Sequence, residues 1–186
     1  MKEKTAKLIR ILTLPQLLLL IALLLLRKQY PGGHVWAAAA LLCLLPLLAY
    51  PVCAVVPKLR AEGRPMQRKL AVIFSVSGYA LGLLYCLVTH GRGTELFVYL
   101  CYFLTGGLIA LSSFGFHLKS SGHAAGVVGP VIILALRLSP WYLFGLLLMV
   151  PVWRSSVALG RHTPRELILG GSYPILVGIV LMLLIP

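Results

Sequence analysis

Long apolar runs separated by short basic segments constrain this chain more than any other feature of its sequence. Of its 186 residues, 60% are hydrophobic and only 11% are charged, whereas a soluble domain is nearer half apolar and about a quarter charged. A run of about 20 apolar residues is long enough for a helix to cross a bilayer. The pattern predicts an all-α, polytopic bundle of transmembrane helices that forms a single membrane domain over 1–186.

We expect seven spans, at about 11–26, 35–57, 70–89, 96–116, 124–136, 141–159 and 167–185. The first run follows a basic segment, which is also the pattern of a signal peptide. Arg27 and Lys28 follow it directly and no small-residue cleavage site does, so an uncleaved span is favoured. A six-helix core with an accessory first span fits the same pattern.

The net charge of +13 indicates a membrane surface or an anionic substrate, and no nucleic-acid partner is expected. If every run crosses, all Lys and Arg residues except Arg27, Lys28, Arg92 and Arg137 lie on the side of the N-terminus. The positive-inside rule then places that side in the cytoplasm. We therefore expect an integral protein of the plasma (inner) membrane, and a homo-oligomer is compatible with the sequence.

The sequence has no aspartate and four acidic residues in all, so a carboxylate-built metal site is not expected. The cysteines fall inside apolar runs without paired spacing, which predicts buried free thiols; they are Cys43, Cys53, Cys86 and Cys101. We predict no cofactor. His34 and His90 are expected to be solvated turn residues.

The strongest chemical signal is His162, followed four residues later by Glu166. Four residues are about one helical turn, so the two side chains can meet. A carboxylate beside an imidazole fixes its tautomer and makes the other ring nitrogen a better base or nucleophile. Pro164 stands where a helix would begin, at the end of the loop that carries His162. The alternative is a loop histidine and a first-turn acid favoured by the helix dipole.

Two further segments lie on the same side of the membrane as this pair. One contains Lys58 and Arg64-Pro65, and the other is Ser120-Ser121-Gly122-His123. Two spans separate each segment from the next, so all three reach one face whether or not the first run crosses. Most polar residues with chemical potential are therefore expected to converge there.

These three segments resemble the motifs of the type 2 phosphatidic acid phosphatase superfamily, the membrane lipid phosphatases related to vanadium haloperoxidases. That family carries Lys with a downstream Arg-Pro, then Pro-Ser-Gly-His, then Ser-Arg with a downstream His and Asp. The resemblance runs in the right order from about Lys58 to Gly171. It implies hydrolysis of a lipid or polyprenyl phosphate, with that lipid and the bilayer as partners.

This sequence departs from the family pattern at four points. The spacing from Lys58 to Arg64 is one residue shorter, Ser120 replaces proline, and Glu166 replaces aspartate. In the third motif Ser156 stands where the phosphate-binding arginine would be. Arg154, Arg161 or Lys119 could supply the missing charge.

A phosphate dianion at a membrane surface needs several cations, and arginine offers two-pronged contacts. His162, oriented by Glu166, is expected to attack phosphorus, and His123 to protonate the leaving oxygen. Gly122 would let backbone N–H groups approach the phosphate, and Ser121 would add a hydroxyl donor. The expected phosphate-binding cations are Lys58, Arg64, Lys119 and Arg154, although Lys119 is equally compatible with a topology charge.

Two other functions remain open. One is a decayed relative that binds phospholipid or acts as a scaffold without turnover, for which Ser156 is the argument. The other is a haem protein with His117, His123 or His162 as axial ligands. These histidines lie at the ends of spans, whereas a bis-histidine pair that binds haem in the bilayer core would lie within the spans. This position disfavours the haem protein.

Overall fold

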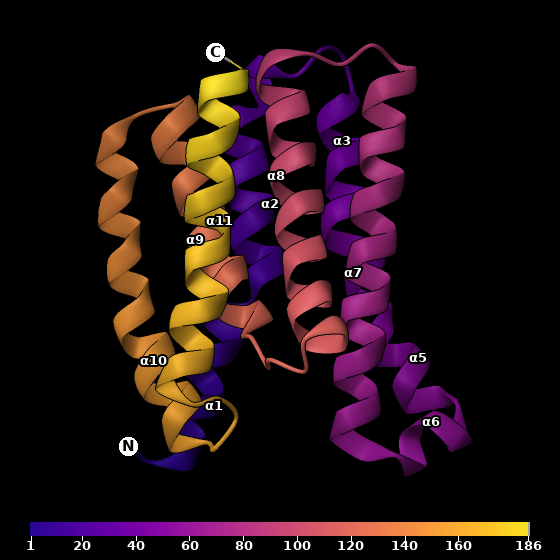
Figure 1. Cartoon of the computed structure of the whole chain (residues 1–186), viewed down its shortest axis with the longest axis vertical. Helices are drawn as coiled ribbons and strands as arrows, with labels where there is room; N and C mark the ends of the chain where they lie inside the picture. The colour runs from indigo at the N-terminus through magenta and orange to yellow at the C-terminus, as the bar shows by residue number, and fades with distance from the viewer. Residues whose placement is uncertain (186) are drawn as a thin grey trace.

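The computed structural model describes residues 1–185 and is an all-α bundle, with no strand among those residues (Figure 1). Six helical segments are long and apolar enough to cross a membrane: Glu3–Gln29, His34–Val55, Gly63–Val88, Gly93–Gly115, Pro140–Ala158 and Pro164–Leu184. A shorter apolar helix, α9 (Gly122–Arg137), adds a seventh segment. The all-α polytopic bundle expected from the sequence is confirmed, and the fold is that of an integral membrane protein.

The first segment begins earlier than the predicted 11–26 and is broken in two. Helix α1 (Glu3–Leu12) ends at Thr13, and α2 (Pro15–Leu26) starts with a proline, which has no N–H to lose in a first turn. The short 3-10 helix η1 (Arg27–Gln29) completes the segment. Helix α1 packs on α10 (Met149–Ala158), and α2 packs on α9.

The second segment is irregular around its prolines. It consists of α3 (His34–Ala38), the wide π turn η2 (Ala39–Leu44), α4 (Leu45–Leu47) and α5 (Ala49–Val55). The break at Leu48 lies between Pro46 and Pro51, and proline inside a helix disrupts its hydrogen bonding. The exposed helix α6 (Pro57–Ala61) follows.

Helix α7 (Gly63–Val88) begins seven residues before the predicted start at residue 70. Its first turns therefore carry Arg64 and Arg68, which lie before the predicted span at 70–89. Basic residues at a helix end can keep their charged heads in water while their apolar stems cover the bundle. The bundle continues with α8 (Gly93–Ala110), the π turn η3 (Leu111–Gly115), the 3-10 helix η4 (Pro140–Leu148) and α11 (Pro164–Leu184).

Helix α9 lies inside the bundle, in contact with α2, α8, α10, α11 and η4. Eleven of its 16 residues are buried. At 16 residues it is about 24 Å long, shorter than the ~30 Å hydrocarbon core. Because other helices surround it, most of its surface packs on protein although it is short.

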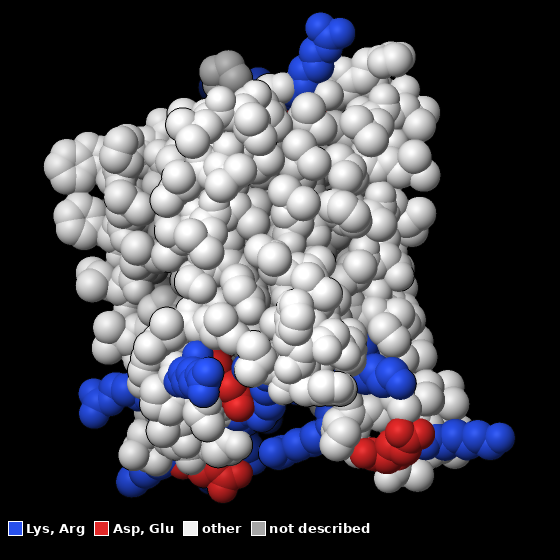
Figure 2. Space-filling view, viewed as in Figure 1, with Lys and Arg blue, Asp and Glu red and all other residues white. Residues whose placement is uncertain are grey.

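Most of the charged residues visible in Figure 2 gather at the end of the molecule that holds the N-terminus in Figure 1. At the opposite end, His34 is half-buried and its Nδ1 lies 2.9 Å from Oε1 of the fully buried Glu95 on α8. The expectation of a solvated His34 was therefore wrong. All four cysteines are buried free thiols, as the sequence predicts.

Candidate functional site

A cavity of about 540 Å³ penetrates the bundle from its charged end. Exposed Arg64, Lys119 and Arg161 line it, so it reaches the surface there. The polar part of the wall also includes Arg10, Arg68, Ser120, His123 and His162, and Gly122 lines the cavity beside them. Farther in, the wall is mainly apolar and aromatic, and includes Leu19, Leu42, Val76, Tyr79, Tyr102 and Pro174. The cavity therefore joins a cationic entrance to an apolar interior.

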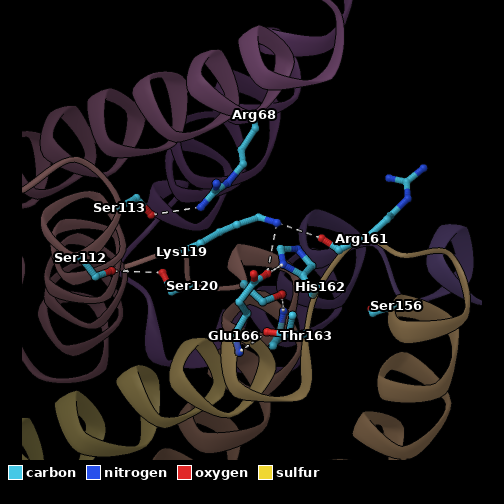
Figure 3. A network of polar contacts seen from close by, with 12 residues as sticks. Arg68, Ser112, Ser113, Lys119, Ser120, Ser156, Arg161, His162, Thr163 and Glu166 are labelled. Carbon is cyan, nitrogen blue, oxygen red and sulfur yellow. Dashed lines mark hydrogen bonds and ion pairs between the residues drawn. The ribbon is translucent and has the colours of Figure 1, made fainter. Parts of the chain in front are cut away.

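His162 and Glu166 form a close pair on the wall of this cavity (Figure 3). The Nδ1 atom of His162 lies 2.7 Å from Oε2 of Glu166. The local sequence builds this contact: Thr163 caps α11 by accepting a hydrogen bond from the Glu166 N–H at 3.3 Å, and Pro164 starts the helix. Because a carboxylate accepts, Nδ1 carries the proton and Nε2 keeps its lone pair.

Lys119 shares the same carboxylate oxygen. Its Nζ lies 3.4 Å from Oε2 of Glu166 and donates to the carbonyl oxygen of Arg161, also at 3.4 Å. In Figure 3 the Lys119 side chain extends across the site between these two partners, while the Arg161 side chain points away from the His162–Glu166 pair. An ammonium group thus lies beside the imidazole.

The N-terminus of α9 is bonded to the start of α11. The Ser121 N–H donates to the carbonyl of Glu166 at 3.0 Å, and Gly170 packs directly on the Ser121 backbone. The Ser121 side chain accepts from the Ala124 N–H at 3.2 Å, so it caps α9. Of the first four N–H groups in α9, which have no intrahelical partner, those of Gly122 and His123 belong to residues that line the cavity.

His123 is held from the other side by the junction between α1 and α2. Its Nε2 lies 3.2 Å from Oγ1 of Thr13, and that hydroxyl donates to the carbonyl of Ile9 at 2.8 Å. Since the hydroxyl proton is already used, the geometry fits a hydrogen bond from Nε2–H of His123 to Thr13. This leaves Nδ1 of His123 to exchange protons with a ligand.

The charge state of His162 is set by opposing effects. Burial lowers the pKa of His162 below its ordinary value of 6.5, and the positive charges of Lys119 and Arg10 lower it further. The hydrogen bond and negative charge of Glu166 raise it, but only in part. The pKa of His162 is therefore lowered overall, and the ring is neutral at pH 7.

The structure brings some of the expected site residues together and separates others. His123, His162, Arg64, Lys119 and Gly122 line the cavity, and Glu166 contacts it through His162. The exposed residues Lys58 and Arg154 do not line it. Ser121 is fully buried, and its hydroxyl caps α9 instead of facing the cavity as a donor for a ligand.

Three residues at the site were not expected there. Arg10 and Arg68 line the cavity, with Arg10 Nη1 donating to Ser156 Oγ at 2.7 Å and Arg68 Nη2 donating to Ser113 Oγ at 3.2 Å. Thr13 contacts His123. In the sequence, Arg10 and Arg68 are indistinguishable from the basic residues that flank any membrane span, and a threonine at the start of an apolar run does not indicate a site. Only the proline after Thr13-Leu14, which predicts a helix break, marks this junction.

His117, proposed above as an alternative haem ligand, is exposed and does not line the cavity. Among residues 1–185, no three His, Cys, Asp or Glu side chains gather closely enough to hold a metal ion. Comparison with models of known protein families, with curated proteins and with solved structures gave no match for this chain.

Proposed function

We propose that the protein is an integral-membrane phosphatase that hydrolyses the phosphomonoester or diphosphate of a lipid or polyprenyl substrate. One observation carries this proposal: the His162–Glu166 pair lies on the wall of a cavity that is cationic at its entrance and apolar inside. A lipid phosphate has the complementary shape and polarity, with a dianionic head and a hydrocarbon tail. The resemblance of the three motifs to the type 2 phosphatidic acid phosphatases supports the same assignment.

The proposed reaction has two balanced steps. Nδ1 of His123 first accepts the proton of the phosphate monoanion, so the bound substrate is a dianion. The Nε2 lone pair of His162 attacks phosphorus, the bond from phosphorus to the lipid oxygen breaks, and His123 gives the proton on Nδ1 to the leaving oxygen. Water then attacks the phosphohistidine and passes one proton to Nδ1 of His123, while the phosphorus–nitrogen bond breaks. Phosphate leaves with that proton, and both histidines return to their initial states.

The cations at the entrance offset charge on the transferring group. Arg64 and Arg68 approach from α7, and Lys119 approaches beside His162. The Gly122 and His123 N–H groups at the N-terminus of α9 can add donors, because a helix N-terminus favours anions. Each contact gains strength where the site excludes water.

The test is phosphate release from a panel of phosphatidate, phosphatidylglycerol phosphate and polyprenyl mono- and diphosphates, by purified protein with and without EDTA. His162→Ala should abolish release and also the labelled phosphoenzyme, which should be acid-labile and alkali-stable as expected for phosphohistidine. His90→Asn is the matched control, because His90 is exposed and its φ of 56° is one that asparagine tolerates. Full turnover by His162→Ala would contradict the mechanism.

A second candidate is a protein that binds lipid phosphates without hydrolysing them. The observation in its favour is Ser156, which stands where the third motif would carry arginine and is fully buried. Saturable binding of the same lipids to wild-type protein without phosphate release, in every buffer and with every substrate of the panel, would support this candidate.

A further inference from the structure

Arg10 is a cavity-lining guanidinium for which the described residues offer no carboxylate. It lies half-buried near the end of α1, and no ion pair involving it occurs within residues 1–185. Its neighbours on the cavity wall include Arg161 and both histidines, and within residues 1–185 Glu166 is the only acidic residue that forms an ion pair with a residue of that wall. Even a half-buried cation is costly among other positive charges unless an anion accompanies it. The cavity is therefore suited to a bound anion.

The guanidinium is fixed by α10. Nη1 of Arg10 donates to Oγ of the fully buried Ser156 at 2.7 Å, across 146 positions of sequence. Helix α10 presents two small residues here, Ser155 and Ser156, both with no exposed surface, and Ala6 of α1 is also fully buried. Small side chains on both helices allow close packing, so the arginine is held before any ligand arrives.

Enough donors remain on Arg10 to bind a ligand. A guanidinium has five N–H donors in a planar fork, and Ser156 accepts from one of them. The same arginine lines the cavity together with His123 and His162. The α1–α2 junction also supplies Thr13 to His123, so one segment holds both a cation and the ring of the expected proton donor.

We propose that Arg10 binds the phosphoryl group of the substrate, and that α1 thereby supplies from the N-terminal end of the chain the arginine that position 156 lacks. The assignment rests on the proposed function for the identity of the substrate. The anion site itself stands on the Arg10–Ser156 contact and the shared cavity. The sequence offered three other candidates for this charge, and the structure places each of them elsewhere. Lys119 is paired with Glu166, and Arg154 does not line the cavity. The Arg161 side chain points away from the His162–Glu166 pair.

The decisive experiment exchanges the two residues. Arg10→Ser should weaken binding of orthovanadate about ten- to hundredfold, the range expected for losing hydrogen bonds from a charged donor, and lower kcat/KM for a lipid phosphate by a similar factor. Ser156→Arg alone should also impair both, because two guanidinium groups would meet. The double variant should recover at least tenfold over Arg10→Ser, since one arginine then lies in the space that the other left.

Orthovanadate binding is read from the rise of the thermal unfolding midpoint in detergent as its concentration increases. Lys4→Ser is the matched control: it removes one exposed cation from the same helix and should leave binding and turnover unchanged. Arg10→Gln and Arg10→Lys provide the test without the exchange. Gln should bind as poorly as Ser, and Lys should bind between Gln and wild type, because it keeps the charge without the fork.

The outcomes separate this inference from the proposed function. If wild-type protein hydrolyses a lipid phosphate and Arg10→Gln does so equally well, the role of Arg10 is overturned and the proposed phosphatase function is retained. If wild-type protein binds vanadate through Arg10 but hydrolyses no lipid phosphate, the phosphatase function is overturned and the anion site at Arg10 is retained. A folded double variant that stays as poor as Arg10→Ser would overturn the equivalence of the two positions.

Discussion

Glu166 has two partners competing for one oxygen atom. Its Oε2 accepts from His162 and also lies 3.4 Å from the ammonium of Lys119. A phosphate dianion entering the cavity would attract Lys119 away from the carboxylate and leave Glu166 to His162 alone. In the proposed mechanism the carboxylate would then stabilise the imidazole when it becomes a positively charged phosphohistidine.

Replacing Glu166 with glutamine should therefore lower kcat by roughly hundredfold or more, the scale of a lost orienting group in acid–base catalysis, with little change in expression. Glu166→Asp keeps the negative charge on a shorter side chain, so its kcat should lie between the values for wild type and Glu166→Gln. The measurement is steady-state turnover of the best lipid phosphate. Equal kcat values for the Gln and Asp variants would show that the charge of residue 166 is unimportant.

The lowered pKa of His162 predicts the shape of the pH profile. In the proposed mechanism neutral His162 is the nucleophile, so the acidic limb of kcat/KM should lie below pH 6.5. Since Glu166 raises this pKa, Glu166→Gln should move the limb to still lower pH while reducing the plateau. A limb that moves upward would contradict this electrostatic assignment.

The same shift affects stability with the sign of a depressed histidine pKa. The unfolded chain takes up a proton near pH 6.5, before the native His162 does. The contribution to the free energy of unfolding is present above pH 6.5 and is lost as the pH falls from there toward the lowered pKa.

At this scale, local spacing predicted the His162–Glu166 contact, because four residues around a helix start set its geometry. No local pattern could predict that Arg10 meets Ser156. Their contact spans 146 positions and depends on how α1 packs on α10. A lysine- and arginine-rich N-terminus has the same appearance whether its charges face lipid head groups or a cavity.

Among the elements, the contact between α9 and α11 positions both histidine segments. A side chain at Gly170 would overlap with the backbone carbonyl of Ser121, which cannot rotate away. Gly170→Ala should therefore push α11 from the N-terminus of α9 and lower the free energy of unfolding by about 1–3 kcal/mol, the usual cost of overpacking. Its turnover should fall as well, since the Ser121–Glu166 hydrogen bond joins the two segments.

The measurement is the thermal unfolding midpoint in detergent, with Gly107→Ala as control. A Cβ at Gly107, also on a long helix, would meet nothing within 4 Å. The control should match wild type or exceed it slightly, because alanine favours a helix over glycine. Equal midpoints for the two alanine variants would show that α11 can move at no cost.

The helices were predictable in number and order because hydrophobic runs of span length have few other solutions in a bilayer. Their ends were less so. Helix α7 starts at Gly63 because a polar sequence can continue a helix beyond the hydrocarbon boundary, which hydropathy does not detect. The burial of α9 was also hidden, since an apolar helix surrounded by protein has the same composition as one that faces lipid.

For the whole molecule, the uneven distribution of charge predicts orientation. We expect the charged end to face the cytoplasm. Glu62→Cys, in the exposed turn before α7, should resist a membrane-impermeant thiol reagent in intact cells and react after permeabilisation. Lys28→Cys, exposed at the opposite end, should behave in the reverse way. The native cysteines are buried and should not react with the thiol reagent. Labelling of Glu62→Cys in intact cells would place the substrate in the outer leaflet.

The contact between Arg10 and Ser156 also has a consequence for biosynthesis. A ribosome adds about 5–20 residues per second, so roughly 7 to 30 s pass between the two residues. During that interval α1 has no α10 to pack on, and Thr13 has no His123 until α9 emerges. The nascent chain therefore inserts most of its helices with the proposed phosphate site still open, and the site is complete only when the sixth and seventh membrane segments, which bring Ser156 and the His162–Glu166 pair, join the first.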